Sequence, residues 1–389
     1  MEIDDVYRGR EHSYIKHELL KGYLEKLLLI VGTTDTREIT YVDCFAGPWG
    51  SEEESLAGTS IAISLEILKG VRNKLIAPPH NKAGLRLRAI YVEENKERHK
   101  RLTSYVNSVS MPGIECHALC GDYSELQDDI LRLCGKGFAF FFIDPLGWTD
   151  VAIPKLEKIA KRPRSEFLIN FMYDFINRFI NKDELRPQIT AILGELDESD
   201  FFKIGVLDSK AREAYVVRRY REQLKAAVGS ERTEKARAYH ARVMDREKER
   251  TKYHLVYVTR HPQGIIEFAE QSEKVDLIQK VVRIQTKRDA SGQPDLFAAK
   301  DEAERQDDDR VDLAVVKEYW LSMLGFDPTP FDNKVLADML EETGWLIRDI
   351  QEAFGELLAE GKAQNMDAAK KRPKHFVHFN KAEQLRRIK

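Results

Sequence analysis

The sequence predicts an α/β protein with a doubly wound, mostly parallel sheet that ends in an antiparallel hairpin, followed by a smaller C-terminal domain. Between residues 38 and 172, five short apolar segments alternate with helical segments, as in strands joined by crossover helices. Residues 235–260 hold two further strand patterns around the charged turn "REKER", which favours an antiparallel hairpin. Three amphipathic helix patterns then follow a long polar stretch.

The first predicted element is a helix over residues 12–31, where apolar residues recur at helical spacing: Ile15, Leu19, Leu20, Tyr23, Leu24 and Leu27. The five predicted parallel strands are 38–45, 87–94, 114–120, 137–145 and 166–172. The helices between them are 58–68, opened by Thr59 or Ser60, then 95–109, 123–134 and 151–160. The run "FAFFFI" is continuously apolar, which is typical of a central strand buried on both faces.

Residues 172–230 have mostly helical patterns and form an insertion before the hairpin strands 235–245 and 252–260. We expect a methyltransferase-like domain over 1–284, a flexible linker over 285–310 and a winged-helix-like domain over 311–389. The linker is polar, charged and nearly free of aromatic residues. The last domain is predicted from helices at 311–324, 333–344 and 346–361 and a basic hairpin after residue 361.

Composition limits the class of protein. With 389 residues, a prior of roughly 150 residues per domain gives two or three domains. A net charge of −3 means that any nucleic-acid surface is a local patch. No signal peptide and no membrane-length apolar run is present. No CxxC pair or metal-ligand cluster surrounds the cysteines, which we expect to be reduced, in a cytoplasmic protein without a metal: Cys44, Cys116, Cys120 and Cys134.

The stretch "YVDCFAGPWGS" (41–51) joins the first strand to the next helix. Its glycines, Gly47 and Gly50, allow close approach of the backbone to a ligand. Three later strands also lead to acids, at Glu93, Asp122 and Asp144. Because the carboxyl ends of parallel strands face one crevice, these side chains are candidates for a nucleotide site. The alternative is that the glycines form a structural turn and each acid caps a helix.

The set "YVDCFAGPWGS", "YVEEN", "GDYSE" and "FFFIDPLGW" resembles the class I S-adenosylmethionine-dependent methyltransferases, whose parallel sheet ends in an antiparallel hairpin. It is most similar to the three-Cys-motif partner protein (TcmP) family, as are "HSYIKHELLKGYL" and "YHLVYVTRHPQGI", over roughly residues 10–285. The resemblance implies the cofactor S-adenosyl-L-methionine and, as a partner, a neighbour-encoded three-cysteine-motif protein.

The resemblance also implies roles for individual residues. The methionine end of the cofactor would be lined by Asp43, Phe45, Gly47 and Gly50. Glu93 would hold the ribose and Asp122 would face the adenine. The usual methyltransferase spacing puts the second glycine where this chain has Trp49.

The segment "IDPLGW" is similar to the motif with which amino-methyltransferases bind a base. There an acid and a backbone carbonyl accept the hydrogens of the amine, and an aromatic ring stacks on the base. Asp144, Pro145 and Trp148 are the corresponding catalytic candidates, although Leu146 replaces the second proline. Alternatively, Asp144 caps the next helix and Trp148 is a rim residue.

Two segments are candidates for contacting DNA or RNA. Near the fifth strand, Tyr173 and Arg178 offer an aromatic ring and a cation. In the basic tail "KKRPKHFVHF", the candidates for phosphate contact are Lys370, Lys371, Arg372 and Lys374. The alternatives are a packed helix in the first case and a protein-interaction module in the second, since the preceding helix is acidic in balance.

The predicted linker contains "GQPDLF", which resembles the short peptide that binds the bacterial sliding clamp. Leu296 and Phe297 would enter an apolar pocket while Gln293 makes a hydrogen bond at its edge. Pro294 replaces the usual leucine. The clamp is therefore a third candidate partner.

Two hypotheses of function follow. The first is an enzyme that methylates a nucleic-acid base, with an adenine amino group as the expected acceptor. The second is a non-catalytic partner that keeps the fold and positions a companion protein on nucleic acid, consistent with the altered glycine spacing and the missing proline. A small-molecule methyltransferase is a weaker third hypothesis, because a winged helix does not serve it.

Overall fold

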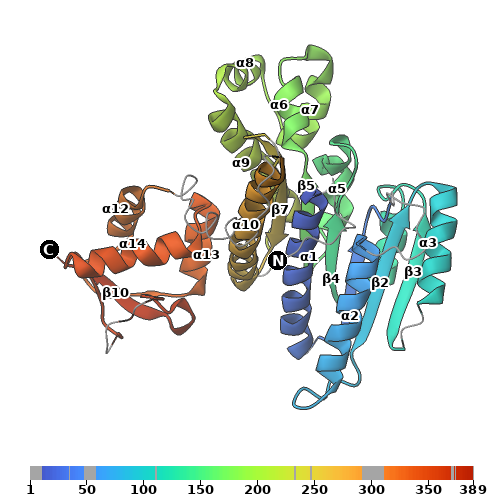
Figure 1. Cartoon of the computed structure of the whole chain (residues 1–389), viewed down its shortest axis with the longest axis horizontal. Helices are drawn as coiled ribbons and strands as arrows, with labels where there is room; N and C mark the ends of the chain where they lie inside the picture. The colour runs from blue at the N-terminus through green and yellow to red at the C-terminus, as the bar shows by residue number, and fades with distance from the viewer. Residues whose placement is uncertain are drawn as a thin grey trace. The chain divides into compact units, whose positions relative to one another are not determined.

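Seven strands form one sheet in the order β3-β2-β1-β4-β5-β7-β6 (Figure 1). The computed structural model describes residues 11–34, 36–47, 58–109, 112–231, 234–245, 248–290, 311–368, 372 and 374–388. The strands are β1 (Glu38–Asp43), β2 (Arg86–Glu93), β3 (Ile114–Cys120), β4 (Phe138–Ile143), β5 (Ser165–Phe171), β6 (Arg237–Met244) and β7 (Thr251–Thr259). The first five strands pair in parallel, and β7 pairs antiparallel with β5 and β6. The predicted α/β class, mostly parallel sheet and terminal hairpin are confirmed.

The predicted helices between the strands are present. They are α1 (Glu11–Thr33), α2 (Ser60–Ile76), α3 (Lys96–Ser108), α4 (Gln127–Cys134) and α5 (Ile153–Ala160). Thr59 caps α2 by accepting a hydrogen bond from the Ala62 amide, and Asn95 caps α3. The insertion after β5 is helical as expected, with α6 (Tyr173–Phe179), α7 (Arg186–Leu193), α8 (Glu198–Val206) and α9 (Ser209–Val228).

The sheet is buried on both faces. Every residue of β4 is buried, as "FAFFFI" predicts. On one face, Val42, Phe141 and Ile169 pack with residues of α4, α5 and α9 in a single apolar cluster. On the other face, the ring of Phe140 stacks with that of Tyr41 and lies near Tyr23 of α1. This two-sided burial supplies most of the stabilisation of a doubly wound sheet.

A buried carboxylate fastens α1 to the sheet. Glu166 of β5 accepts hydrogen bonds from the hydroxyls of Tyr257 (2.6 Å), Thr259 (2.9 Å) and Tyr23 (3.1 Å). Three donors satisfy a group that would otherwise be costly to bury. The contact fixes the helix that begins the chain's described part against β5 and β7.

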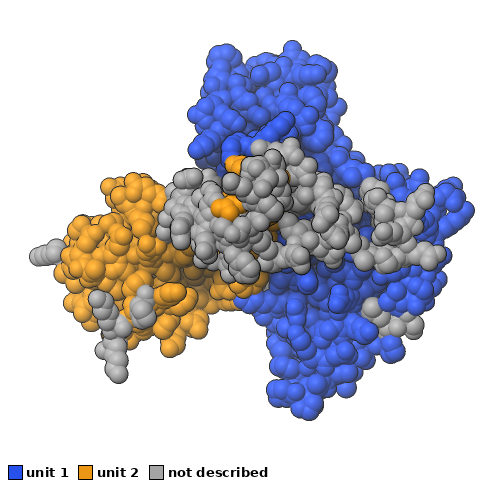
Figure 2. Space-filling model, in the orientation of Figure 1, with its two compact units in different colours: residues 1–260 blue, residues 261–389 orange. Residues whose placement is uncertain are grey.

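The chain divides into two compact units, Met1–Arg260 and His261–Lys389 (Figure 2). The second contains α10 (Pro262–Ala290), α12 (Leu313–Met323), α13 (Asn333–Thr343) and α14 (Ile347–Ala359). Its antiparallel sheet has the order β8-β10-β9, formed by β8 (Thr329–Phe331), β9 (Ala363–Asn365) and β10 (Glu383–Arg387). The three helices and the hairpin predicted after residue 310 are therefore present.

The second unit differs from the predicted domain in where it begins. Helix α10 packs against α13, and Asn333 donates a hydrogen bond to Gln263 (2.7 Å). The helix also continues to Ala290, so residues 285–290 of the predicted linker are helical. Lys287 and Arg288 lie in the last turn of α10. In the sequence, their charge made this segment resemble the polar linker that follows it.

Within the residues that the structure describes, no helix is long and apolar enough to cross a membrane.

The side chain of Arg162 connects the loops that precede β4 and β5. Its buried guanidinium donates hydrogen bonds to a ring of main-chain carbonyls and one hydroxyl: Cys134, Gly135, Gly137, Pro163, Arg164 and Ser165. Such groups are expensive to leave unpaired inside a protein.

We expect Arg162→Met to lower the free energy of unfolding by about 3 kcal/mol, because the variant leaves several buried carbonyls without donors. Urea unfolding followed by circular dichroism measures the change. Lys161→Met, at the exposed neighbouring position, is the matched control and should change stability by less than about 0.5 kcal/mol. Equal stability of the two variants would contradict the assigned role.

Candidate functional site

A pocket with a volume of about 100 Å³ lies at the carboxyl ends of β1, β2 and β3. It is lined by Cys44, Phe45, Gly47, Val92, Glu93, Glu94, Arg98, Gly121, Asp122, Tyr123, Leu146 and Asp150. Four of the six residues predicted for the cofactor thus line one pocket: Phe45, Gly47, Glu93 and Asp122. Asp43 lies buried beside it, and Gly50 is outside the described residues.

The side chain of Glu93 fills the space that a side chain at position 47 would need. A Cβ on Gly47 would lie 2.0 Å from Oε2 of Glu93, so only glycine leaves room for the carboxylate. The Glu93 side chain is 4% exposed, and its Oε1 accepts hydrogen bonds from the Asn95 amide (2.7 Å) and from Nε of Arg98 (3.0 Å). Within the described part of the chain, Oε2 has no hydrogen-bond partner. That oxygen is therefore available to a ligand hydroxyl.

Asp122 is held in a similar way after β3. Its Oδ1 accepts hydrogen bonds from the amide and the hydroxyl of Ser124, both at 2.7 Å. The neighbouring ring of Tyr123 packs against Phe45, with centroids 4.8 Å apart, and its hydroxyl donates to the Asp150 carbonyl (2.6 Å). This links the loops after β1, β3 and β4 into one wall of the pocket.

Leu146 completes the rim on the β4 side. It is 69% exposed although it is a large apolar residue, and it lines the same pocket. The sequence singled out Leu146 only as a departure from a two-proline motif. Its place beside Val92 and Asp122 in the lining gives the pocket an apolar edge next to acids, which suits the flat ring of a base.

The charge of the pocket selects among ligands. The described lining carries four carboxylates, at Glu93, Glu94, Asp122 and Asp150, and one guanidinium, that of Arg98. Arg98 already forms an ion pair with Glu93, and Lys155 forms one with Asp150 (2.6 Å). Among the described residues, Glu94 and Asp122 therefore carry the excess negative charge of the lining. An excess of negative charge repels phosphate groups and attracts cations. The pocket therefore suits a neutral or positively charged nucleoside better than a nucleotide.

Asp43 is completely buried at the end of β1. Its Oδ1 accepts a hydrogen bond from the Phe45 amide (3.1 Å) and its Oδ2 accepts one from the Ser60 hydroxyl (2.6 Å). Burial raises the pKa of Asp43 to about 6, and the nearby Asp144 adds to the rise. Asp43 thus ties the turn to the start of α2 and does so at an energetic cost when it is ionised.

Asp144 follows β4 and is held from two sides. Lys16 of α1 forms an ion pair with its Oδ2, and Nδ2 of Asn170 donates to its Oδ1 (2.7 Å). No helix after β4 is capped by this side chain, because neither 3₁₀ helix η2 (Thr149–Val151) nor α5 has a side-chain cap. The alternative reading of Asp144 as a helix cap is therefore wrong.

The two other residues predicted for catalysis follow this acid in the loop after β4. Pro145 is buried, and Trp148 is half-buried and lies 6.4 Å from Phe179 of α6, measured between ring centroids. Sequence reasoning did not find Lys16 or Asn170. Lys16 could have been noticed as a polar residue next to the buried apolar residues of α1. Asn170 could have been noticed as an amide within an otherwise apolar strand.

The two residues proposed for nucleic-acid contact near β5 have local partners. Tyr173 is 2% exposed, and its hydroxyl donates to the Ser209 carbonyl. Arg178 pairs with Asp174 (3.0 Å) and lies over the ring of Phe175. In this conformation the Tyr173 ring offers almost no surface to a base, because the helical insertion packs around it.

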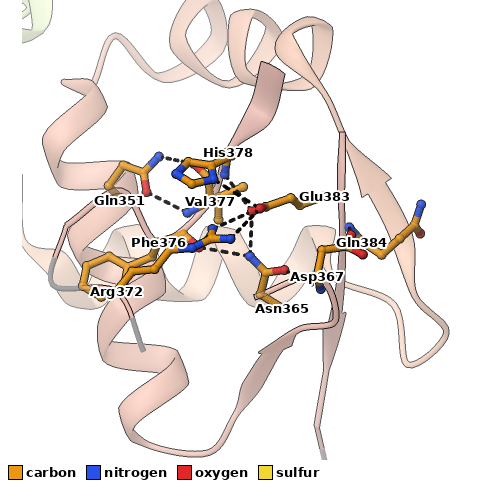
Figure 3. A network of polar contacts seen from close by, with 9 residues as sticks. All are labelled: Gln351, Asn365, Asp367, Arg372, Phe376, Val377, His378, Glu383 and Gln384. Atoms are coloured by element: carbon orange, nitrogen blue, oxygen red, sulfur yellow. Dashed lines mark hydrogen bonds and ion pairs between the residues drawn. The ribbon is translucent and has the colours of Figure 1, made fainter. Parts of the chain in front are cut away.

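In the second unit, a polar network centred on Glu383 organises the basic tail (Figure 3). Burial acts to raise the pKa of this carboxyl, but Arg372, the His378 amide and Asn365 outweigh it and lower the pKa to about 2. Arg372 donates to both carboxylate oxygens, at 2.7 and 2.9 Å. Arg372 is thus already neutralised by a protein carboxylate.

The other residues of the basic tail that were predicted to contact phosphates are lysines. Lys374 is exposed. Lys370 and Lys371 lie outside the described residues, as do the clamp-peptide residues Gln293, Leu296 and Phe297. Helix α14 carries three acids, Asp349, Glu352 and Glu356, against one cation, Arg348, so its charge is unsuited to a negatively charged groove.

We predict that Asp43→Asn raises the free energy of unfolding relative to wild type, and more so at high pH. Because the folded pKa of Asp43 is raised to about 6, the stability of the protonated form is lost as pH rises through about 4 to 6. Between pH 4.5 and 7.5 the advantage of the variant should grow by about 2 kcal/mol. Urea unfolding at both pH values measures it, and a difference that is constant with pH would refute ionisation of Asp43 as the cause.

Comparison of the sequence with protein-family models found no matching family. A search of curated proteins likewise found no similar protein. The site must therefore be interpreted from its own residues.

Proposed function

We propose that this protein is an S-adenosyl-L-methionine-dependent methyltransferase acting on a nucleic-acid base, with an adenine amino group as the acceptor. The observation that carries the proposal is the acidic pocket in which Gly47, Glu93 and Asp122 meet. S-adenosyl-L-methionine is a nucleoside that carries a sulfonium cation and no phosphate. Its positive charge matches such a pocket, whereas a dinucleotide would bring two phosphates against carboxylates.

The residues present fit this cofactor. Oε2 of Glu93 has no partner among the described residues and would accept from the ribose hydroxyls. Asp122, with Leu146 at the rim, would receive the adenine, and the turn at Phe45 and Gly47 would hold the methionine end. When bound, the cofactor supplies an activated methyl group, so the protein need mainly align an acceptor and exclude water.

The arrangement of strands supports the same class. A parallel sheet that ends in an antiparallel hairpin is typical of class I methyltransferases and not of Rossmann dehydrogenases, which normally end in a parallel strand. Here β7 pairs antiparallel with both of its neighbours. Of the motifs that resemble the three-Cys-motif partner protein family, "YVEEN" covers the end of β2 and "YHLVYVTRHPQGI" contains most of β7, whereas "HSYIKHELLKGYL" lies in α1.

The acceptor side rests on Asp144. An ionised carboxylate beside the pocket accepts hydrogens from an amine and leaves the nitrogen lone pair free to attack. Asp144 follows the strand next to β1, and the loop it begins supplies Leu146 and Asp150 to the pocket. Nucleic-acid contact is assigned to the basic tail of a winged-helix-like second unit, where Lys374 is exposed, rather than to the acidic α14.

A second candidate is a non-catalytic partner that binds a companion protein. One observation favours it: both carboxylate oxygens of Asp144 are engaged by Lys16 and Asn170. A carboxylate that only fastens α1 to the sheet needs no acceptor substrate. Methyl transfer separates this candidate from the enzyme.

Gly47→Ala should weaken binding of S-adenosyl-L-methionine at least tenfold, because the new Cβ displaces the Glu93 carboxylate. Isothermal titration calorimetry of wild type and variant tests this. The matched control is Gly84→Ala, where a Cβ meets no atom within 4 Å, and its affinity should equal that of wild type. Undiminished binding by Gly47→Ala would remove this pocket as the cofactor site.

Asp144→Ala should bind the cofactor as wild type does and lose at least 100-fold of the transfer rate, because the amine loses its acceptor. Transfer of labelled methyl groups to single- and double-stranded DNA and to RNA measures it. Asp128→Ala, at an exposed acid, is the control for folding and background. Cofactor binding without any transfer by wild type would favour the non-catalytic partner.

A further inference from the structure

The side chain of Asn170 leaves one polar atom without a partner. Asp144 is a carboxylate and only accepts, so Asn170 must turn its NH₂ group toward Oδ1 of that acid, as the 2.7 Å hydrogen bond shows. The amide oxygen Oδ1 of Asn170 is then buried with no hydrogen-bond partner. Asn170 is 2% exposed. A buried, unsatisfied acceptor is costly and indicates a missing donor.

The other oxygen of Asp144 is occupied by a cation. Lys16 reaches it from α1, and the side chains of Lys16 and Asp144 are only 13% and 17% exposed. An ammonium group is the closest chemical counterpart in the protein of a substrate amine, because both are nitrogen donors that carry several hydrogens. Lys16 thus donates where an acceptor amine would have to donate.

The register of the sheet brings these groups together. Ile143 of β4 is paired with Ile169 of β5, so the next residues along the strands, Asp144 and Asn170, emerge side by side. Asp43 ends the strand on the other side of β4. The cluster therefore lies at the carboxyl edge of the sheet, next to the pocket whose lining includes Cys44 and Leu146.

We propose that Lys16 is a gate residue of the acceptor site: its ammonium occupies the place on Asp144 that the acceptor amine takes, and the incoming amine also donates to Oδ1 of Asn170. This inference rests on the proposed methyltransferase function. It adds a side-chain acceptor, Oδ1 of Asn170, next to the carboxylate of Asp144. A primary amine has two hydrogens for the two acceptors, whereas a hydroxyl has only one, so the site selects amino groups.

The test compares two cofactor analogues by calorimetry. Sinefungin carries a primary amine in place of the methylsulfonium group, and S-adenosylhomocysteine carries neither a methyl group nor an amine at that position. The ratio of their dissociation constants isolates the contribution of the amine from that of the rest of the pocket. It also requires no knowledge of the nucleic-acid substrate.

In Lys16→Met, sinefungin should gain about tenfold in affinity relative to S-adenosylhomocysteine, because its amine no longer competes with a resident ammonium. In Asn170→Leu, which has a similar side-chain volume, it should lose about tenfold relative to S-adenosylhomocysteine. Lys21→Met replaces an exposed lysine on the same helix and should leave the ratio unchanged. A role for Lys16 in stability alone would weaken both analogues equally.

An unchanged ratio in both Lys16→Met and Asn170→Leu, with both analogues still bound, would overturn the gate and leave the proposed cofactor site standing. If wild type binds neither analogue, the proposed function itself fails, and the gate fails with it. Should Lys16→Met not fold, Lys16→Gln and the Asn170 variant carry the same comparison.

Discussion

The burial of β4 on both faces is the constraint on which the rest of the first unit depends. A strand without a solvent-facing side must be covered by helices on both faces of its sheet, and β4 also lies in the middle of the sheet, between β1 and β5. Parallel pairing then aligns the carboxyl ends of all three. Because of this register, Asp43, Asp144 and Asn170 meet at one edge although they are far apart in the sequence.

The charged groups at the carboxyl ends of these strands lower the stability of the folded state. Burial raises the pKa of Asp43, the nearby Asp144 raises it further, and the Lys16 ammonium lowers it. An apolar arrangement of the same volume would be at least as stable. Clusters of buried charge that lower the stability of the fold are characteristic of functional sites. Under the proposed function, the cationic cofactor would offset this negative charge, as it would that of the neighbouring acidic pocket.

The sequence predicted what depends on local patterns and missed what depends on distant pairing. Apolar periodicity and capping residues such as Thr59 located the strands and helices, and acids after strands located Glu93 and Asp122. Lys16 and Asp144 are separated by 128 positions, and nothing near either one indicates the other. Likewise, Arg372 was a free cation in the sequence, whereas folding brings Glu383 against it. The burial of Tyr173 follows from packing of the helical insertion, which periodicity alone does not reveal.

The acidity of the pocket also bears on how a nucleic acid would approach. Under the proposed function, the carboxylates of Glu94 and Asp122 in the pocket lining repel a phosphate backbone, so the strand must stay outside and only a neutral base can reach the carboxyl ends of the strands. A base paired within a duplex cannot do so without leaving the stack. The cations that hold the backbone must then lie elsewhere, and neutralisation of Arg372 leaves that task to lysines such as Lys374. Under the proposed function, the residues that contact the phosphates must therefore be different from those that bind the base. A chain with a net charge of −3 is compatible with a nucleic-acid substrate for this reason.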